Sequence, residues 1–328
     1  AARGDADRAI ADFDQSLRID PKSALAYYNR GLALRTKGDE ERAIADFSQA
    51  IKIDAKNAAA FHNRGMAYRS RGDLERALAD FDQSILIDPK NAFAYFERGN
   101  ARYDKRDFDR AIADLNMAIN IKPDYTAAFN LRGTAYNAKG DGDRAIADFD
   151  QALRIDPTFA PAYSNRGDAY QKKRDFDRAI ADFDQAIKAN PNYPGAYFNR
   201  GLARQDKREF ELAIADFTRA IKLDPKNAAA YNARGFSQMN RNEDEQAFAD
   251  YDQAIKLNPA FAAAYYNRGL ASYERRDFER AIGDLSQTIR LDPRDMLAVH
   301  ARGLAYRERR DFDRAIADFD AALRLDPK

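Results

Sequence analysis

The side chains that could perform acid–base or metal chemistry are two histidines and many carboxylates. His62 and His300 stand far apart in the chain, which has no cysteine. A catalytic carboxylate pair is expected to interrupt a repeating pattern at one place, whereas the aspartates here recur at a fixed interval. Neither histidine has the neighbouring ligands that a metal site needs. These residues predict a chain with no catalytic activity, no metal and no cofactor.

A more informative pattern is arginine followed by glycine, which recurs every 34 residues without insertion or deletion. Alanine and aspartate recur at the same interval, from Ala9 to Ala315 and from Asp12 to Asp318. A period of this length indicates an array of similar structural units. The arginine–glycine positions are Arg30-Gly31, Arg64-Gly65, Arg98-Gly99, Arg132-Gly133, Arg166-Gly167, Arg200-Gly201, Arg234-Gly235, Arg268-Gly269 and Arg302-Gly303.

Each unit has the apolar spacing of two amphipathic helices. In the second unit, Asn57 is placed to cap the first helix, Asp73 to cap the second, and Pro89 to end it. We therefore expect one continuous all-α domain, in which a lone second helix precedes nine two-helix units. The expected boundaries are 1–23 for the lone helix and 24–57, 58–91, 92–125, 126–159, 160–193, 194–227, 228–261, 262–295 and 296–328 for the units.

The arginine and aspartate columns are expected to pair between helices, because a cation near a core is costly without a partner. Arg30 could reach Asp46 in its own unit or Asp12 in the preceding helix, and the spacing leaves both open. Gly31 stands in the middle of a helix, where glycine costs about 1 kcal/mol relative to alanine. Its recurrence predicts a close approach to the small Ala43 of the second helix.

The repeat resembles the tetratricopeptide repeat family, in which aromatic, glycine, alanine and proline positions mark each unit. In the second full unit these positions hold Phe61, Gly65, Tyr68, Ala77, Phe81, Ser84 and Pro89. The resemblance covers nearly the whole chain and is similar in style to bacterial arrays. It implies an α-solenoid that forms a right-handed superhelix, with the first helix of each unit lining a concave groove. The arginine and aspartate columns depart from the usual pattern of the family.

Asparagines on the expected groove side of the first helices are the candidate binding residues. They are Asn29, Asn63, Asn165, Asn199 and Asn267. Where the same column holds Leu131 and Ala233, the preceding residues are Asn130 and Asn232. A carboxamide donates and accepts hydrogen bonds at once, so a row of them could hold the backbone of an extended peptide. The row is similar to the asparagine ladder in the repeat region of O-GlcNAc transferase. The alternative is that the amides satisfy only neighbouring helices or water.

Aromatic side chains recur on the same expected face, at Tyr28, Phe96, Phe198, Phe236 and Tyr266. Aromatic anchors beside polar groups are typical of peptide-binding surfaces. We therefore predict a scaffold that binds an extended peptide or a segment of a partner protein. A clamp for acidic chaperone tails is not expected, because that subclass of the family needs a lysine in the Tyr28 column.

Two other functions remain open from the sequence. Apolar faces on the terminal helices would let copies stack end to end into a homo-oligomer. These faces contain Ile10, Phe13 and Leu17 at one end and Phe319 and Leu323 at the other. The chain does not open with methionine, so we expect a piece of a longer protein, which could be the substrate-recruiting arm of an enzyme.

The charge balance argues against nucleic acid or a membrane surface as the partner. The chain has 54 lysines and arginines against 53 aspartates and glutamates, a formal net charge of +1. No apolar run approaches the roughly 20 residues that span a bilayer. We expect a soluble protein and leave open whether it is cytoplasmic or periplasmic.

Overall fold

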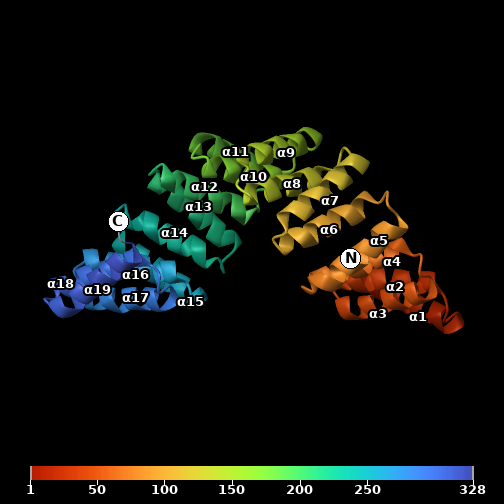
Figure 1. The fold of residues 1–328 in the computed structure, drawn as a ribbon, viewed down its shortest axis with the longest axis horizontal. Helices are drawn as coiled ribbons and strands as arrows, with labels where there is room; N and C mark the ends of the chain where they lie inside the picture. The colour runs from red at the N-terminus through yellow and green to blue at the C-terminus, as the bar shows by residue number, and fades with distance from the viewer. Residues whose placement is uncertain (1, 327–328) are drawn as a thin grey trace. The chain divides into compact units, whose positions relative to one another are not determined.

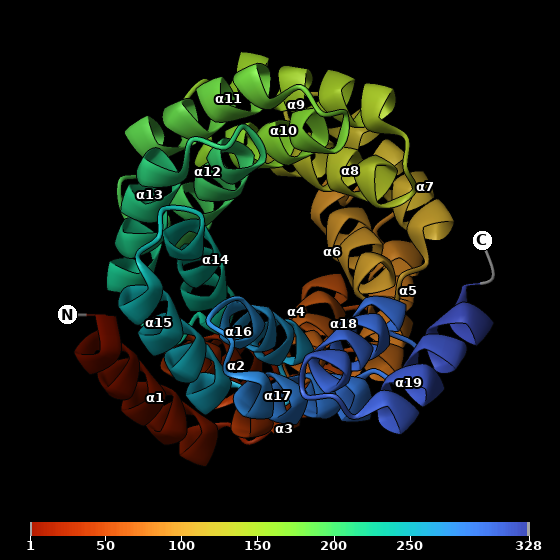
Figure 2. The same cartoon turned by 90° about the vertical axis from the view of Figure 1, so that its left-hand side faces the viewer.

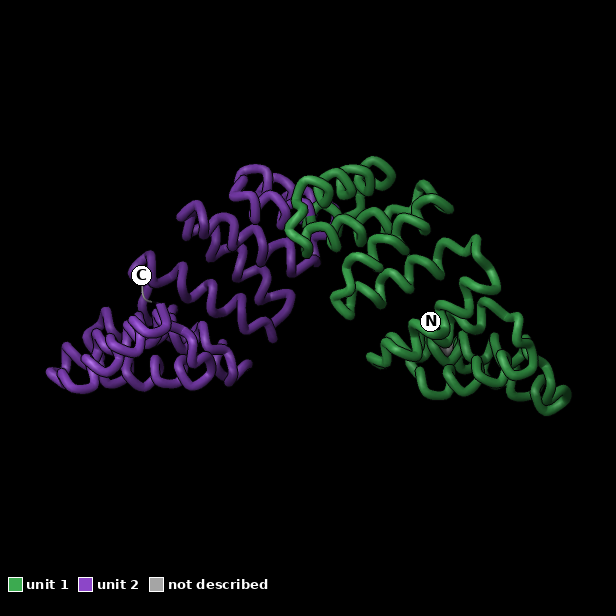
Figure 3. The backbone as a smooth tube through the Cα atoms, viewed as in Figure 1, with its two compact units in different colours: residues 1–165 green, residues 166–328 purple. Residues whose placement is uncertain are grey.

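The computed structural model describes residues 2–326, which form nineteen α-helices and no strand (Figure 1). The fold is an all-α solenoid, as predicted, and divides into two compact units, residues 1–165 and 166–328 (Figure 3). The predicted repeat boundaries stay a prediction, and residues 1, 327 and 328 lie outside the described residues.

The helices of the first unit are α1 (Ala2–Ile19), α2 (Ala24–Lys37), α3 (Glu40–Ile53), α4 (Ala58–Ser70), α5 (Leu74–Ile87), α6 (Ala92–Asp104), α7 (Phe108–Ile121), α8 (Thr126–Ala138) and α9 (Gly142–Ile155). The division between the units falls inside α10 (Ala160–Lys172). The second unit continues with α11 (Phe176–Ala189), α12 (Pro194–Asp206), α13 (Phe210–Leu223), α14 (Ala228–Met239), α15 (Asp244–Leu257), α16 (Ala262–Glu274), α17 (Phe278–Leu291), α18 (Met296–Glu308) and α19 (Phe312–Leu325).

Within each unit the helices stack in pairs, and a helix pair is here an even-numbered helix with the odd-numbered helix that follows it. Among the described helices, contacts between second neighbours join only even-numbered helices, such as α2 with α4 and α14 with α16. Figure 2 shows the even-numbered helices on the inner side of each unit's curve and the odd-numbered helices on the outer side. We call the surface where successive even-numbered helices meet the inner wall.

The predicted helix caps are confirmed. The side chain of Asn57 accepts a hydrogen bond from the backbone nitrogen of Ala60 at 2.9 Å, at the start of α4. The side chain of Asp73 accepts one from the backbone nitrogen of Arg76 at 3.1 Å, at the start of α5. Helix α5 then ends at Ile87, two residues before Pro89, because proline cannot continue a helix. These caps fix where each helix begins and ends.

The contact between the two helices of a pair, which we call the seam, contains the predicted ion pair. Nε and Nη2 of Arg30 donate to the two carboxylate oxygens of Asp46, each at 2.7 Å. The same two-point contact occurs in all nine helix pairs. The arginine therefore pairs inside its own helix pair, with the planar geometry that makes such contacts strong.

The expected alternative contact of Arg30 with Asp12 is wrong. Its remaining nitrogen, Nη1, donates instead to Asp14 at 2.7 Å, on the odd-numbered helix before it. Asp12 is exposed, because the rotation of α1 directs Asp14, and not Asp12, towards Arg30. An arginine whose Nη1 donates to a residue of the preceding odd-numbered helix therefore links its own helix pair to the pair before it.

The glycine of the seam approaches an aromatic ring more closely than it approaches the expected Ala43. A Cβ added to Gly31 would lie 2.6 Å from the ring of Phe47, which is completely buried. The backbone of the alanine column does come near in other pairs, as at Gly65, where the added atom would lie 3.2 Å from the carbonyl oxygen of Ala77. Glycine is required because the ring occupies the space of a side chain.

The expected apolar ends are found at only one end of the described chain. Ile10 and Leu17 of α1 are buried against their neighbours, so the expectation that they are exposed is wrong. On α19, Leu323 is 61% exposed and Ile316 is 59% exposed. No described helix packs on that side of α19, whereas the equivalent residues of earlier odd-numbered helices are partly or fully covered by the next helix pair.

Candidate functional site

The predicted asparagines all lie on even-numbered helices and are all half-buried. They are Asn29 on α2, Asn63 on α4, Asn130 on α8, Asn165 on α10, Asn199 on α12, Asn232 on α14 and Asn267 on α16. Their hydrogen bonds show how the inner wall is assembled. A residue on one even-numbered helix meets the residue 35 positions later on the next even-numbered helix.

Two of these contacts join asparagines to each other. Nδ2 of Asn165 donates to Oδ1 of Asn130 at 3.0 Å, and Nδ2 of Asn267 donates to Oδ1 of Asn232 at the same distance. The asparagines that precede Leu131 and Ala233 are thus partners of the amide column in the next helix pair. Nδ2 of Asn165 also donates to Oγ1 of Thr134 at 3.3 Å. Each amide pair still keeps one NH2 group and one oxygen that form no hydrogen bond with a described residue.

In the first unit the same register joins an amide to a phenol. Nδ2 of Asn63 donates to the hydroxyl of Tyr28 at 3.2 Å and to the backbone oxygen of Ala59 at 2.9 Å. Oδ1 of Asn63 accepts from Nη1 of Arg35 at 2.8 Å. This amide is fully occupied within the wall. In contrast, the side chains of Asn29 and Asn199 make no hydrogen bond with any described residue.

The register also pairs apolar residues with apolar residues. Phe96 and Leu131 pack in one cluster, Phe198 and Ala233 in another, and Tyr266 and Ala301 in a third. Three pairs of this register are thus joined by hydrogen bonds, and three others lie within one apolar cluster each. The inner wall is a series of matched side-chain pairs, each made by two successive even-numbered helices.

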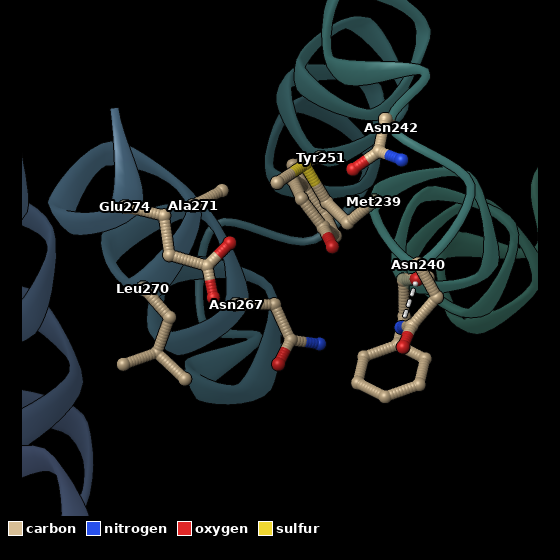
Figure 4. Close-up of a pocket in the computed structure, with 9 residues that line it drawn as sticks. Met239, Asn240, Asn242, Tyr251, Asn267, Leu270, Ala271 and Glu274 are labelled. Atoms are coloured by element: carbon tan, nitrogen blue, oxygen red, sulfur yellow. Dashed lines mark hydrogen bonds between the residues drawn. The ribbon is translucent and has the colours of Figure 1, made fainter.

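The predicted aromatic residues differ in how far they reach solvent. Tyr28, Phe96, Phe198 and Tyr266 are half-buried within the wall. Phe96, for example, stacks on Tyr125 with ring centres 5.0 Å apart. Phe236 is 39% exposed, and together with Asn267 it lines a cavity of about 290 Å³ between α14 and α16 (Figure 4).

Charged side chains gather on the inner wall of the first unit. Nε of Arg35 lies 3.7 Å from a carboxylate oxygen of Glu40, and both atoms are buried without a hydrogen bond. His62 lies beside them, its Nδ1 also buried and without a partner, and burial together with the charge of Arg35 lowers the pKa of His62 to about 4. Burial likewise raises the pKa of Glu97, although Arg69 at 3.3 Å opposes it.

Tyr251, on α15, and Glu274, on α16, are absent from the predicted binding residues. The sequence carries a signal for Tyr251, since it stands in a column that otherwise holds phenylalanine or leucine. The pairing of polar residues 35 positions apart is a further feature of the wall. It can be recognised in the sequence only once the partner helix is known. Glu274 has no such signal, because its column varies freely along the chain.

Two kinds of site are not found in the part of the chain that is described. No group of three or more histidine, aspartate or glutamate side chains lies close enough together to hold a metal ion. Between residues 2 and 326, no helix combines the length and apolar character needed to cross a bilayer.

Comparison with protein-family models gives matches along most of the chain. A model described as "Tetratricopeptide repeat" matches residues 1–60, 164–228, 200–249 and 273–328. A model described as "TPR repeat" matches residues 65–106, 133–173 and 239–275, and a further tetratricopeptide repeat model matches residues 94–125. Comparison with curated protein sequences gives no match.

Comparison with solved structures also gives matches. The Cut9–Hcn1 hetero-tetramer of the APC/C aligns over 97% of this chain and 79% of its own, with 17% identity and a TM-score of 0.62. MamA is 29% identical over 49% of this chain and 94% of its own, with a TM-score of 0.46. YrrB, titled a TPR protein with an unusual peptide-binding site, is 23% identical over 56% of this chain and 95% of its own, with a TM-score of 0.47.

Proposed function

Because the chain belongs to the tetratricopeptide repeat family, we propose that it is a non-catalytic interaction scaffold that binds an extended peptide segment along its inner walls. The amides of the walls would bind the peptide backbone, in a role similar to that of the asparagine row in the repeat region of O-GlcNAc transferase. The exposed ring of Phe236 and the half-buried aromatics would add contacts to the peptide's side chains.

The observation that carries this proposal is the set of unused hydrogen-bonding groups in the amide pairs. In the pair of Asn130 with Asn165, the NH2 group of Asn130 and the oxygen of Asn165 have no partner among the described residues. One free donor beside one free acceptor is the complement of a peptide group, which carries one of each. The pair of Asn232 with Asn267 offers the same combination in the second unit.

The test is to replace an amide pair with an apolar pair that the chain already uses. Asn130→Phe with Asn165→Leu copies the contact of Phe96 with Leu131 one helix pair earlier, so the fold should be kept. A displayed library of linear peptides would be selected against the unaltered chain, and affinities of the selected peptides would be measured by fluorescence anisotropy. We expect the double variant to lose about 10-fold or more, since each hydrogen bond contributes about 1 kcal/mol.

Lys52→Ala, at an exposed position of the outer helix α3, is the control and should bind as the unaltered chain does. Peptides with a single N-methylated backbone position should bind more weakly when that position faces an amide pair. The proposal is contradicted if the double variant keeps its helical content and binds every selected peptide with unchanged affinity.

A second candidate function is self-association, favoured by the exposed apolar stripe of α19. Phe312, Ile316 and Leu323 are 57%, 59% and 61% exposed. If this face joins copies of the chain, mass measured by light scattering should increase with concentration. Ile316→Lys with Leu323→Lys should then abolish the increase without changing peptide binding.

A further inference from the structure

The cavity of the second unit lies where the inner wall departs most from its repeating pattern. It has a volume of about 290 Å³ and opens between α14 and α16, with α15 behind it. The residues lining it are Phe236, Met239, Asn240, Asn242, Tyr251, Asn267, Leu270, Ala271 and Glu274. Figure 4 shows these side chains around a shared open space.

The cavity adjoins two positions where the chain carries unusually short side chains. Gln238 and Ser272 occupy a column that in most other helix pairs holds tyrosine or arginine. Both residues are buried, and Oε1 of Gln238 and Oγ of Ser272 have no hydrogen-bond partner. Helix α14 also ends at Met239, after 12 residues, whereas its neighbours α12 and α16 have 13. These two short side chains and the shorter helix distinguish this part of the chain from the other helix pairs.

Tyr251 places a hydroxyl group at the edge of this space. Its side chain is 1% exposed, and it is the one tyrosine in a column of phenylalanine and leucine. The hydroxyl makes no hydrogen bond with any described residue. Burial raises the pKa of Tyr251, so the phenol stays neutral and can both donate and accept. An unpartnered polar group on a buried side chain calls for an explanation, and a bound ligand is one.

Besides the side-chain amide of Asn242, the cavity presents a carboxylate and two amide oxygens that accept no hydrogen bond from a described residue. The carboxylate of Glu274 faces the same space as Tyr251 and forms no ion pair with a described residue (Figure 4). The NH2 group of Asn240 donates to the backbone oxygen of Phe236 at 2.9 Å, and that of Asn267 donates to Asn232. Both amides therefore keep their oxygens free.

We propose that this cavity is a subsite for an arginine side chain of the bound peptide, an inference that rests on the proposed peptide-binding function. The aliphatic stem packs against Met239 and Leu270, and the guanidinium donates to the carboxylate of Glu274 and to the hydroxyl of Tyr251. Arginine fits better than lysine because its five N–H groups lie in a plane and reach several separated acceptors at once. An acidic side chain is excluded by Glu274.

The test follows methionine signals, because the chain has four methionines and one of them lines the cavity. The protein is labelled with 13C at the methionine methyl groups and titrated with N-acetyl-arginine methylamide. The signal of Met239 should move in the millimolar range, while that of Met66, on α4 of the first unit, should not. The norleucine and lysine counterparts, which lack the guanidinium, should shift Met239 at least 5-fold less at equal concentration.

Two substitutions assign the shift to the proposed contacts. Glu274→Gln should weaken arginine binding at least 5-fold, and Tyr251→Phe, which restores the usual residue of its column, should weaken it at least 2-fold. Glu308→Gln is the matched control, because Glu308 stands in the same column one helix pair later and pairs with Arg307 at 2.9 Å. It should leave the titration unchanged.

The proposal is overturned if norleucine or lysine moves Met239 as much as arginine does, or if Glu274→Gln and Tyr251→Phe leave the titration unchanged. A complete lack of response to arginine also overturns it. None of these results affects the proposed peptide binding, which the amide-pair variant tests in the first unit with peptides selected without regard to arginine.

Discussion

The seam and the inner wall are built from the same helices but follow different rules. Along the seam, arginine, aspartate and glycine recur in all nine helix pairs with nearly unchanged contacts. Along the inner wall, the matched pairs change from amide with amide to phenylalanine with leucine or alanine. The constant part can hold any helix pair together, whereas the variable part changes along the chain and can distinguish one ligand from another.

The largest effect should come from breaking the seam. Asp216 accepts hydrogen bonds from both Arg200 and Arg204, whereas Asp250 accepts from Arg234 alone. Removing one partner of a buried ion pair costs about 3–5 kcal/mol, because the other charge loses its compensation. Asp216→Ala should therefore lower the free energy of unfolding by about 4 kcal/mol, and Asp250→Ala by about 3 kcal/mol.

Urea denaturation followed by circular dichroism measures both values. Asp184→Ala is the control, because Asp184 also contacts Arg200 but is exposed, and exposed ion pairs contribute about 1 kcal/mol or less. Equal losses for Asp184→Ala and Asp216→Ala would show that the seam has no special role in stability.

The next largest effect is a loss of folding stability at low pH, caused by His62 on the inner wall. Because burial and Arg35 lower the pKa of His62 from 6.5 to about 4, the folded chain keeps this ring neutral where the unfolded chain binds a proton. The stability from the neutral ring is complete above pH 6.5 and is lost as the pH falls towards 4, by about 1.4 kcal/mol per pH unit. Lowering the pH from 7 to 5 should cost about 2 kcal/mol.

NMR titration can read the pKa of His62 directly, because the chain has only two histidines. His62→Phe should remove this part of the pH dependence, whereas His300→Phe, at an exposed position of the same column, should leave it. A titration of His62 near pH 6.5 in the folded protein would show that the wall does not bury this ring.

The smallest effect is the change in stability when a glycine is replaced by alanine. Its sign is expected to differ between Gly201 and Gly283. Gly201→Ala would place a Cβ 2.6 Å from the ring of Phe217, which is fully buried, so we expect a loss of about 1–3 kcal/mol. Gly283 of α17 has no atom within 4 Å of an added Cβ, and its column otherwise holds alanine. Gly283→Ala should therefore stabilise the chain by up to about 1 kcal/mol, as helix propensity predicts.

Denaturation midpoints of the two alanine variants, measured side by side, provide this test. A gain in stability for Gly201→Ala would mean that the seam can open to accept a methyl group. In that case the recurrence of glycine in the seam would have no steric cause.

The parts of the fold that could be predicted are those that repeat. The caps at Asn57 and Asp73 follow from local chemistry, and the pairing of Arg30 with Asp46 follows from the cost of a buried charge. The contact of Arg30 with Asp14, and of Gly31 with Phe47, could not be predicted because each depends on how one helix is rotated against another. A rotation of a few tens of degrees exchanges one neighbour for the next.

The candidate site is less predictable for the same reason. The asparagine column was identified from its spacing, but its partners lie on another helix and include a phenol, an amide and a guanidinium. The cavity beside Tyr251 is lined by Met239 and Ala271, the sequence neighbours of Gln238 and Ser272, whose side chains are shorter than usual in their column. A missing volume leaves no pattern in the sequence unless the residues that normally fill it are known.

The register of 35 residues means that none of the matched pairs of the wall belongs to a single repeat. Each pair is shared, with one side chain supplied by each of two consecutive modules. An isolated module placed in another array would therefore keep the contacts of its seam. It would lose the wall pairs that it forms with the modules on either side. The smallest piece that transfers a complete binding element is two adjacent modules, so engineering and evolutionary duplication alike must move them together.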